Sequence, residues 1–150
     1  MKNLFPIFVM LLLIGSSCKE NQVVSQDDVD KQLIIDYLKQ NDTEAESLES
    51  GLFYLIRENG NDRHPSTSSN ITVSYVGKLL NGQRFDQGEF FTSPLNQLIA
   101  GWQQGIPLIG EGGKITLYIP SSLGYGSQSA GSIPANSVLI FDVTLHYFAD

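Results

Sequence analysis

Cysteine and histidine are scarce in this 150-residue sequence, which has one of the former and two of the latter. A single cysteine forms no internal disulfide bond. His64 and His146 have no second ligand at metal-site spacing, no Ser or Cys partner at nucleophile spacing, and no glycine-rich loop opens a helix. We therefore expect no metal, no cofactor and no covalent catalysis, and we interpret both histidines as surface residues.

Basic side chains are also few. The chain has 9 Lys and Arg against 16 Asp and Glu, a net charge of -7, and no cluster of basic residues. Proteins that bind nucleic acid need Lys and Arg to neutralise phosphates. The composition therefore predicts no nucleic-acid partner, and the length predicts one globular domain.

Long apolar runs are limited to residues 4–14, a stretch that is short for a membrane span. It follows Lys2 and precedes the small residues 15–17, which is the order of parts in a secretory signal peptide. We therefore expect residues 1–17 to be a signal peptide. Its removal would leave eight basic and sixteen acidic side chains, a net charge of -8.

Cys18 would then be the first residue of the mature chain. Its position resembles that of the lipidated cysteine in bacterial lipoprotein signals. The resemblance implies a lipid on Cys18 that anchors the protein to a membrane of the cell envelope, on the periplasmic or outer-membrane side. A free N-terminal cysteine in a soluble periplasmic protein is the alternative. In both cases residues 18–27 are interpreted as a polar tether.

Helical spacing of apolar residues begins after this tether. It predicts an amphipathic helix from Asp28 to about Asn41, with acidic residues at its start, where they suit the helix dipole. The charged residues 41–51 break the pattern, so 28–50 are expected to be a helix and a linker. The apolar positions of the helix are Val29, Leu33, Ile34, Tyr37 and Leu38.

From Gly51 onward the alternation of apolar and polar residues predicts strands. It occurs in four segments, LFYLIR, ITVSYVGKLL, GKITLYIP and VLIFDVTLHYF. Asn81-Gly82 predicts a tight turn, after which the chain doubles back through residues 83–86. A brief helix is expected in LIAGWQQGI. The inner face of the last segment is predicted to carry Leu139, Phe141, Val143, Leu145 and Tyr147.

These elements predict an α+β domain over residues 51–150, in which a mostly antiparallel sheet packs against one short helix. Aromatic residues fall at strand ends, on the short helix and in the loop between Pro120 and Pro134. Core packing explains most of them singly, but Tyr125, between two glycines, has little to pack against locally. Together they predict an apolar pocket lined by Tyr75, Phe85, Phe91, Trp102, Tyr125 and Phe141.

Three segments resemble successive motifs of the FK506-binding (FKBP) family of peptidyl-prolyl cis–trans isomerases: SYVGKLLNGQRFD, LIAGWQQGIPLIGEGGKITLYIP and LGYGSQSAGSIPANSVLIFDVTL. The resemblance runs from about Leu52 to Tyr147. It implies a half-open antiparallel sheet wrapped around a short helix. The extra N-terminal helix is similar to that of bacterial secreted members, where such a helix mediates a homodimer or caps the domain.

The resemblance further implies isomerase activity of class EC 5.2.1.8, without a cofactor, on proline-containing segments of exported proteins, and binding of the macrolide inhibitors of the family. It implies that Trp102 is the pocket floor, that Asp86 and the Tyr125 hydroxyl are polar groups, and that the Ile99 N–H meets a substrate carbonyl. The implied catalytic residues are Tyr75, Phe85, Asp86, Trp102, Tyr125 and Phe141. The implied substrate-binding residues are Phe91, Leu98, Ile99 and Ile133.

Two other functions are compatible with the same residues. A non-catalytic chaperone or binding module would hold proline-containing chains in the same pocket. A structural lipoprotein of an envelope complex would instead fill the pocket with its own side chains, with Tyr125 and Phe141 collapsed onto Trp102. Isomerisation makes no covalent bond to the substrate, so it agrees with a sequence that has no candidate nucleophile.

Overall fold

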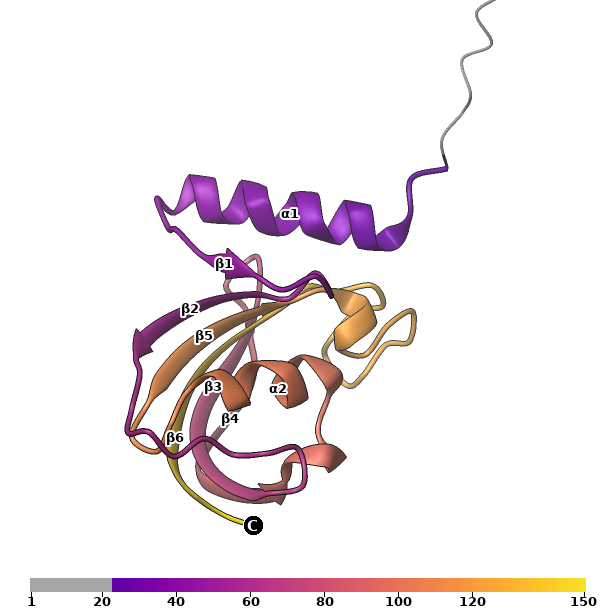
Figure 1. Ribbon diagram of the computed structural model, residues 1–150. Coiled ribbons are helices and arrows are strands. Elements are labelled where there is room, and N and C mark those ends of the chain that lie inside the picture. Colours follow the sequence, from indigo (N-terminus) through magenta and orange to yellow (C-terminus); the bar gives the residue numbers. More distant parts are fainter. Residues whose placement is uncertain (1–22) are drawn as a thin grey trace, which may run out of the picture.

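The computed structural model describes residues 23–150; the expected signal peptide and Cys18 lie outside this range. The described residues contain helix α1 (Gln26–Gln40), a six-stranded antiparallel sheet and a second short helix, α2 (Ala100–Gly105) (Figure 1). Neither helix in this range has the length and apolar character of a membrane-crossing segment. Short 3₁₀ helices cover Leu95–Gln97, Ile106–Leu108 and Ser121–Leu123.

The sheet has the strand order β1-β2-β5-β6-β3-β4 and curves around α2 (Figure 1). This arrangement confirms the expected α+β plan of a half-open antiparallel sheet around a short helix, with an additional N-terminal helix. The strands in spatial order are β1 (Glu46–Ser47), β2 (Phe53–Glu58), β5 (Lys114–Ile119), β6 (Leu139–Ala149), β3 (Asn70–Leu79) and β4 (Arg84–Pro94).

Each face of the sheet packs against a helix. The larger hydrophobic cluster contains Trp102 of α2 and the inner-facing residues of β5 and β6, as the alternation predicted. A second cluster joins Ile34 and Leu38 of α1 to Tyr118 of β5. Because α1 covers that outer face, Tyr118 is only 3% exposed.

Helix α1 begins at Gln26, two residues before the expected start. Ser25 is its N-cap: the Ser25 hydroxyl accepts a hydrogen bond from the Asp28 N–H, and the Asp28 carboxylate accepts one from the Ser25 N–H. This capping box satisfies two backbone donors that would otherwise be free at the helix start. The segment expected as a linker contains β1, which pairs with β2.

The expectation that Tyr147 lies on the inner face of the last strand is wrong. The pairing of β6 with β3 shifts register between Thr72↔Tyr147 and Val73↔Leu145, so one extra residue, His146, is inserted. A one-residue bulge moves the following side chains to opposite faces. Tyr147 is accordingly 57% exposed, and Phe148 is 7% exposed and part of the main core.

The histidines differ in their surroundings. His64 is exposed, and its Nδ1 lies 2.9 Å from the carbonyl oxygen of Pro107. His146 is half-buried rather than freely exposed: its Nε2 lies 2.7 Å from the Ser74 hydroxyl, and its ring stacks on Phe90 at a centroid distance of 4.4 Å. Both contacts of His146, with Ser74 and with Phe90, are on the outer face of the sheet, opposite α2.

Helix α2 approaches the sheet closely because residue 101 is a glycine. A Cβ at this position would lie 2.6 Å from Cγ2 of Ile119 on β5, which is shorter than any real Cβ contact. The next residue is Trp102, which is 4% exposed. The close approach of α2 therefore fixes the indole against the concave face of the sheet.

Candidate functional site

A hollow of about 260 Å³ opens where the concave face of the sheet meets α2. Strands β3, β4 and β6 form one side of it, α2 and the residues just before it form another, and the loop after β5 reaches its edge. We call it the aromatic hollow. Its lining residues are Tyr75, Asp86, Phe91, Gln97, Leu98, Ile99, Trp102, Tyr125 and Phe141.

Three aromatic rings form the centre of the aromatic hollow. The rings of Tyr75 and Phe141 each stand edge-on to the indole of Trp102, at centroid distances of 5.2 Å and interplanar angles of 84° and 89°. This edge-to-face geometry is favourable for aromatic quadrupoles. Trp102 Nε1 is buried and has no hydrogen-bond partner within residues 23–150. The arrangement gives the hollow a rigid, apolar floor.

Further rings support this centre. Phe91 stands edge-on to Tyr75 at 5.9 Å, and Phe85 stands edge-on to Phe141 at 5.4 Å. The last pair lies directly over Gly77 of β3, where a Cβ would be 2.7 Å from an edge carbon of each phenyl ring. Any other residue at position 77 would have to displace both rings. Glycine is therefore required by close approach, since its φ is ordinary.

The polar group of the aromatic hollow is a tyrosine–carboxylate pair. The Tyr75 hydroxyl donates a 2.8 Å hydrogen bond to Oδ2 of Asp86, whose Oδ1 accepts from the Gln87 N–H at 2.8 Å. Burial, followed by the hydrogen bond and negative charge of Asp86, raises the pKa of Tyr75 to about 12. The phenol is therefore protonated at neutral pH and holds the Asp86 carboxylate in place.

Ile99 presents a backbone donor at the start of α2. Its carbonyl accepts from the N–H groups of Trp102 and Gln103 at 2.9 and 3.2 Å, while its own N–H has no acceptor within the described residues. The side chain of Gln103 donates to the Leu98 carbonyl at 2.7 Å and so holds the turn before the helix. A carbonyl entering the aromatic hollow would find this N–H free.

Tyr125 belongs to the loop between β5 and β6 and is 42% exposed. The loop closes on itself through the Ser121 carbonyl, which accepts from the N–H groups of Gly124 and Gly126 at 3.0 and 2.8 Å. Further along, Ala130 and Ile133 form an isolated β-bridge. The loop thus places a partly solvated phenol ring at the rim of the aromatic hollow.

The structure brings together eight of the ten side chains assigned to one pocket by the aromatic pattern and the family resemblance: all except Phe85 and Ile133 line the hollow. Phe85 packs behind Phe141, and Ile133 is 6% exposed in the same hydrophobic cluster. Gln97 also lines the hollow and was not anticipated, because a polar residue in a turn carries no pattern that marks a site. The catalytic and binding roles of these residues stay predictions.

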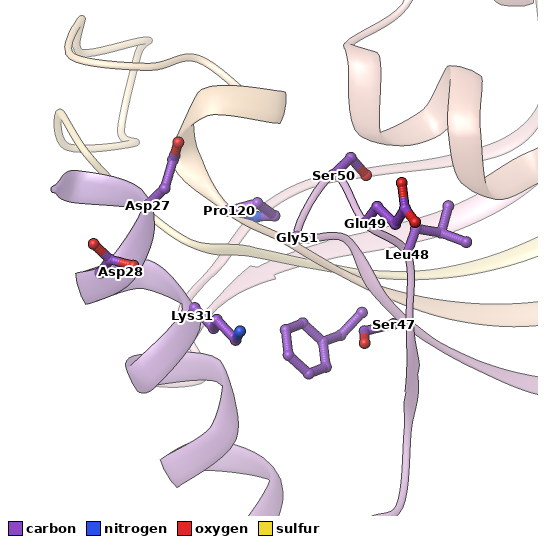
Figure 2. Close-up of a pocket in the computed structure, with 10 residues that line it drawn as sticks. Asp27, Asp28, Lys31, Ser47, Leu48, Glu49, Ser50, Gly51 and Pro120 are labelled. Atoms are coloured by element: carbon purple, nitrogen blue, oxygen red, sulfur yellow. The ribbon is translucent and has the colours of Figure 1, made fainter.

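Volume alone does not identify this site. A larger hollow of about 440 Å³ lies between α1 and the segment around β1 (Figure 2). Figure 2 shows charged side chains on both of its sides, Asp28 and Lys31 on α1 and Glu49 across from them. A third, of about 420 Å³, lies over Ser74 and Asp142. Neither gathers a cluster of rings, so the aromatic hollow is the better candidate for an apolar ligand.

Comparison with known proteins gives one family. The family model described as "FKBP-type peptidyl-prolyl cis-trans isomerase" matches residues 61–146. A relative from Aeromonas hydrophila, "FKBP-type peptidyl-prolyl cis-trans isomerase FkpA", is 45% identical over 105 residues, which are 67% of this chain and 39% of the relative. The chain thus spans well under half the length of this curated relative.

Solved structures give the same result. The crystal structure of FkpA from Escherichia coli superposes with a TM-score of 0.72 at 33% identity and covers 83% of this chain and 60% of its own. That of AtFKBP13 superposes with a TM-score of 0.65 at 35% identity and covers 71% of this chain and 99% of its own. The fold, the aromatic hollow and the family match agree, and the chain therefore belongs to the FKBP-type peptidyl-prolyl cis-trans isomerase family.

Proposed function

We propose that this protein is a peptidyl-prolyl cis–trans isomerase that assists the folding of exported proteins. The observation that supports this most strongly is the aromatic hollow, in which the rings of Tyr75 and Phe141 pack edge-on to Trp102 and the Tyr75 hydroxyl donates to the one lining carboxylate, Asp86. A proline ring is apolar and compact, and the flanking peptide groups are polar. The lining matches both parts of such a substrate.

The reaction needs no nucleophile. Rotation about the X–Pro bond is opposed by amide resonance, a barrier of about 18–20 kcal/mol, and takes tens to hundreds of seconds without a catalyst. In the twisted state the resonance is lost and the amide is less polar. A dry apolar wall disfavours the planar, polar ground state relative to the twisted one. Each tenfold acceleration requires about 1.4 kcal/mol of such preferential binding.

The apolar and the polar residues of the aromatic hollow have different proposed roles. The indole of Trp102 and the rings of Tyr75 and Phe141 enclose the proline ring. The free N–H of Ile99 donates to a substrate carbonyl, and Asp86 and the Tyr125 hydroxyl orient the polar groups beside the rotating bond. Leu98 and Phe91 complete the walls, while Phe85 and Ile133 support them from behind. No atom of the protein forms a bond to the substrate.

The test is a protease-coupled cis/trans assay on a short X–Pro peptide with the purified protein. We expect catalysis by the wild-type protein and a loss of about ten- to 150-fold in kcat/KM for Asp86→Ala, because a charge-assisted hydrogen bond is worth about 1.5–3 kcal/mol. Asp62→Ala, in an exposed loop, is the control for loss of one negative charge. A well-folded wild-type protein without activity would contradict the proposal.

A non-catalytic chaperone or envelope-complex module predicts peptide binding in this hollow without acceleration of isomerisation. The same assay, run beside a binding titration, separates the two functions. The family match favours the enzyme. Macrolide inhibitors of the family are a further expected ligand of the hollow, and their addition should suppress both catalysis and peptide binding.

The proposed location is the cell envelope, on the periplasmic or outer-membrane side, with a lipid on Cys18 as the anchor and the following residues as its tether. The support is the order of sequence features before residue 19. Growth of cells with labelled fatty acid should label the wild-type protein and not Cys18→Ser. Label in both proteins, or in neither, would contradict the anchor.

A homodimer through α1 is proposed on the exposure of that helix. Val29 and Leu33 are 41% and 43% exposed apolar residues of α1, whereas Ile34 of the same helix is 0% exposed and packs in the cluster that joins α1 to the sheet. Sedimentation of the purified protein should give a dimer that Leu33→Glu dissociates. A wild-type monomer at tens of micromolar would favour a capping role for α1 instead.

A further inference from the structure

Asp30 is a buried carboxylate on a helix that the family match does not include. It lies in α1, is 0% exposed, and precedes the matched residues 61–146. Its Oδ2 accepts from the backbone N–H of Ser121 at 2.7 Å and from the Ser121 hydroxyl at 2.6 Å. Its Oδ1 accepts from Nε2 of Gln26 at 2.7 Å. A buried carboxylate is costly unless its oxygens are hydrogen-bonded, and here both are.

Ser121 is the point at which the loop containing Tyr125 leaves β5. Its N–H and hydroxyl face α1, and its carbonyl accepts from the N–H groups of Gly124 and Gly126, the two neighbours of Tyr125. Figure 1 shows this start of the loop beneath the first turns of α1. Asp30 is therefore linked to the backbone on both sides of Tyr125 through one residue.

Side-chain packing holds the two sides of Tyr125 unequally. Before it, Leu123 packs against the main core, and a Cβ on Gly124 would lie 3.0 Å from Cδ1 of Leu139. After it, a Cβ on Gly126 would meet nothing within 4 Å, and Tyr125 itself is 42% exposed. The Gly126 carbonyl accepts from the Asn136 N–H at 2.8 Å, which ties the turn to the far end of the same loop rather than to the sheet. The hydrogen bonds at Ser121 are its connection to α1.

We propose that Asp30 is a positioning residue for Tyr125. Because Asp30 holds Ser121 by hydrogen bonds, the position of α1 determines where the phenol ring lies over the aromatic hollow. The proposal rests on the proposed isomerase function, because its consequence is catalytic. Asp30 does not touch the substrate. A change at α1, from a bound partner or a substitution, would be transmitted to Tyr125 through these hydrogen bonds.

Charge-removing variants of the full chain test the link. Asp30→Ala removes the acceptor. Asp36→Ala removes a carboxylate from the exposed side of the same helix, where Oδ1 only accepts from Gln32, and is the matched control. Asp30→Asn keeps one oxygen for Ser121 and should retain most of the behaviour of the wild type. Ser121→Ala keeps the backbone contact and is the substitute should Asp30→Ala not fold.

Amide hydrogen exchange is the readout that does not depend on activity. We expect exchange at Gly124 and Gly126 to be at least about tenfold faster in Asp30→Ala than in the wild type or in Asp36→Ala, because loosening of the turn exposes these amides without global unfolding. Unchanged exchange at both amides in a folded Asp30→Ala protein would overturn the proposal, even if the protein proved to have no isomerase activity.

Isomerase kinetics test the route through Tyr125. Asp30→Ala should lower kcat/KM about tenfold in the wild-type background, whereas in a Tyr125→Ala background it should cause less than about a twofold further loss, since coupled residues are not additive. Equal losses in both backgrounds would show that Asp30 acts on global stability instead, and would overturn the proposal. An inactive wild-type protein would contradict the proposed function alone and leave the exchange result to decide the link.

Discussion

The Tyr75 hydroxyl donates a 2.8 Å hydrogen bond to Oδ2 of Asp86, across two neighbouring strands and inside the aromatic hollow. The phenol also stands edge-on to Trp102, so one side chain connects the apolar floor to the single carboxylate of the lining. This pair is a donor–acceptor contact rather than an ion pair. It positions the carboxylate without neutralising its charge.

The first prediction concerns pH. Tyrosine in an unfolded chain has a pKa of about 10, and the fold raises the pKa of Tyr75 to about 12. Below pH 10 Tyr75 is protonated in both the folded and the unfolded state, and its hydrogen bond to Asp86 contributes fully to the free energy of unfolding. As pH rises from 10 to 12 the unfolded state loses its proton first, so the free energy of unfolding falls.

Urea denaturation at pH 8 and pH 11 measures this loss. The share due to Tyr75 should be about 1 kcal/mol, less than the full shift implies, because the side chain is partly exposed and solvent screens Asp86. Tyr75→Phe should show a smaller fall between the two pH values than the wild type. An identical fall in both proteins would assign the pH dependence to other tyrosines.

Much of this site could be predicted from the sequence because its residues lie in regular elements. Strand alternation placed Tyr75 and Phe141 on the face that α2 covers, and the short helical segment placed Trp102 beside them. Tyr125 stood out because two flanking glycines left it no local packing. The periodicity of apolar residues and the presence of turn-forming residues predict these features from the local sequence, without any knowledge of long-range contacts.

The remainder depended on contacts between distant segments. The inserted residue at His146, which exchanges the faces of Tyr147 and Phe148, is a property of the pairing of β6 with β3 and has no local sequence mark. The sequence places Asp30 among the acidic residues at the start of the helix. Its burial follows from a hydrogen bond with Ser121, 91 residues away along the chain. Local patterns predict an element and its faces, but not the irregularities that tertiary pairing introduces.

The second prediction uses that exchange of faces. Phe148 is buried in the main core, with the guanidinium carbon of Arg63 4.9 Å from its ring centroid, whereas Tyr147 is exposed. Phe148→Ala should lower the free energy of unfolding by about 3–5 kcal/mol, and Tyr147→Ala by about 0.5 kcal/mol. Urea titration at neutral pH compares them. A larger effect at Tyr147 would contradict the register of β6.

The third prediction concerns the floor of the hollow. Trp102→Ala leaves a cavity and should cost about 3–5 kcal/mol of stability, with a large loss of kcat/KM. Trp102→Phe keeps an aromatic floor and loses no internal hydrogen bond, because Nε1 has no partner within residues 23–150. It should therefore keep more of both stability and activity. A folded Trp102→Ala protein with the full isomerase rate would remove Trp102 from the proposed machinery.

Trp102 is also the one tryptophan of the sequence, which makes it a reporter of the site. A proline-containing peptide that enters the aromatic hollow should change the intrinsic fluorescence, and an Ala-for-Pro peptide of the same sequence should change it less. The titration gives an affinity for each variant independently of turnover. A stability loss without a change in affinity would separate folding effects from binding.

The fourth prediction tests whether packing against Gly77 and Phe85 fixes the position of Phe141 in the wall of the aromatic hollow. Replacing a strand glycine with alanine ordinarily stabilises a protein by about 0.5–1 kcal/mol through the backbone. At Gly77 a Cβ would lie 2.7 Å from both the Phe85 and the Phe141 ring, and these rings are already packed edge-on to each other. Overpacking of this kind costs about 1–3 kcal/mol. The steric cost should therefore exceed the gain from the backbone, and Gly77→Ala should have a lower free energy of unfolding than the wild type.

The same substitution should weaken function more than stability alone explains, because one of the two displaced rings is Phe141, a wall of the aromatic hollow. We expect kcat/KM of Gly77→Ala to fall about tenfold at a temperature where the protein stays folded. Val76→Ala, one residue earlier in β3 and facing the other side of the sheet, is the control and should keep its rate. If Gly77→Ala bound a proline peptide as tightly as the wild type and turned it over as fast, Phe85 and Phe141 would be free to rearrange, and the hollow would not depend on their fixed position.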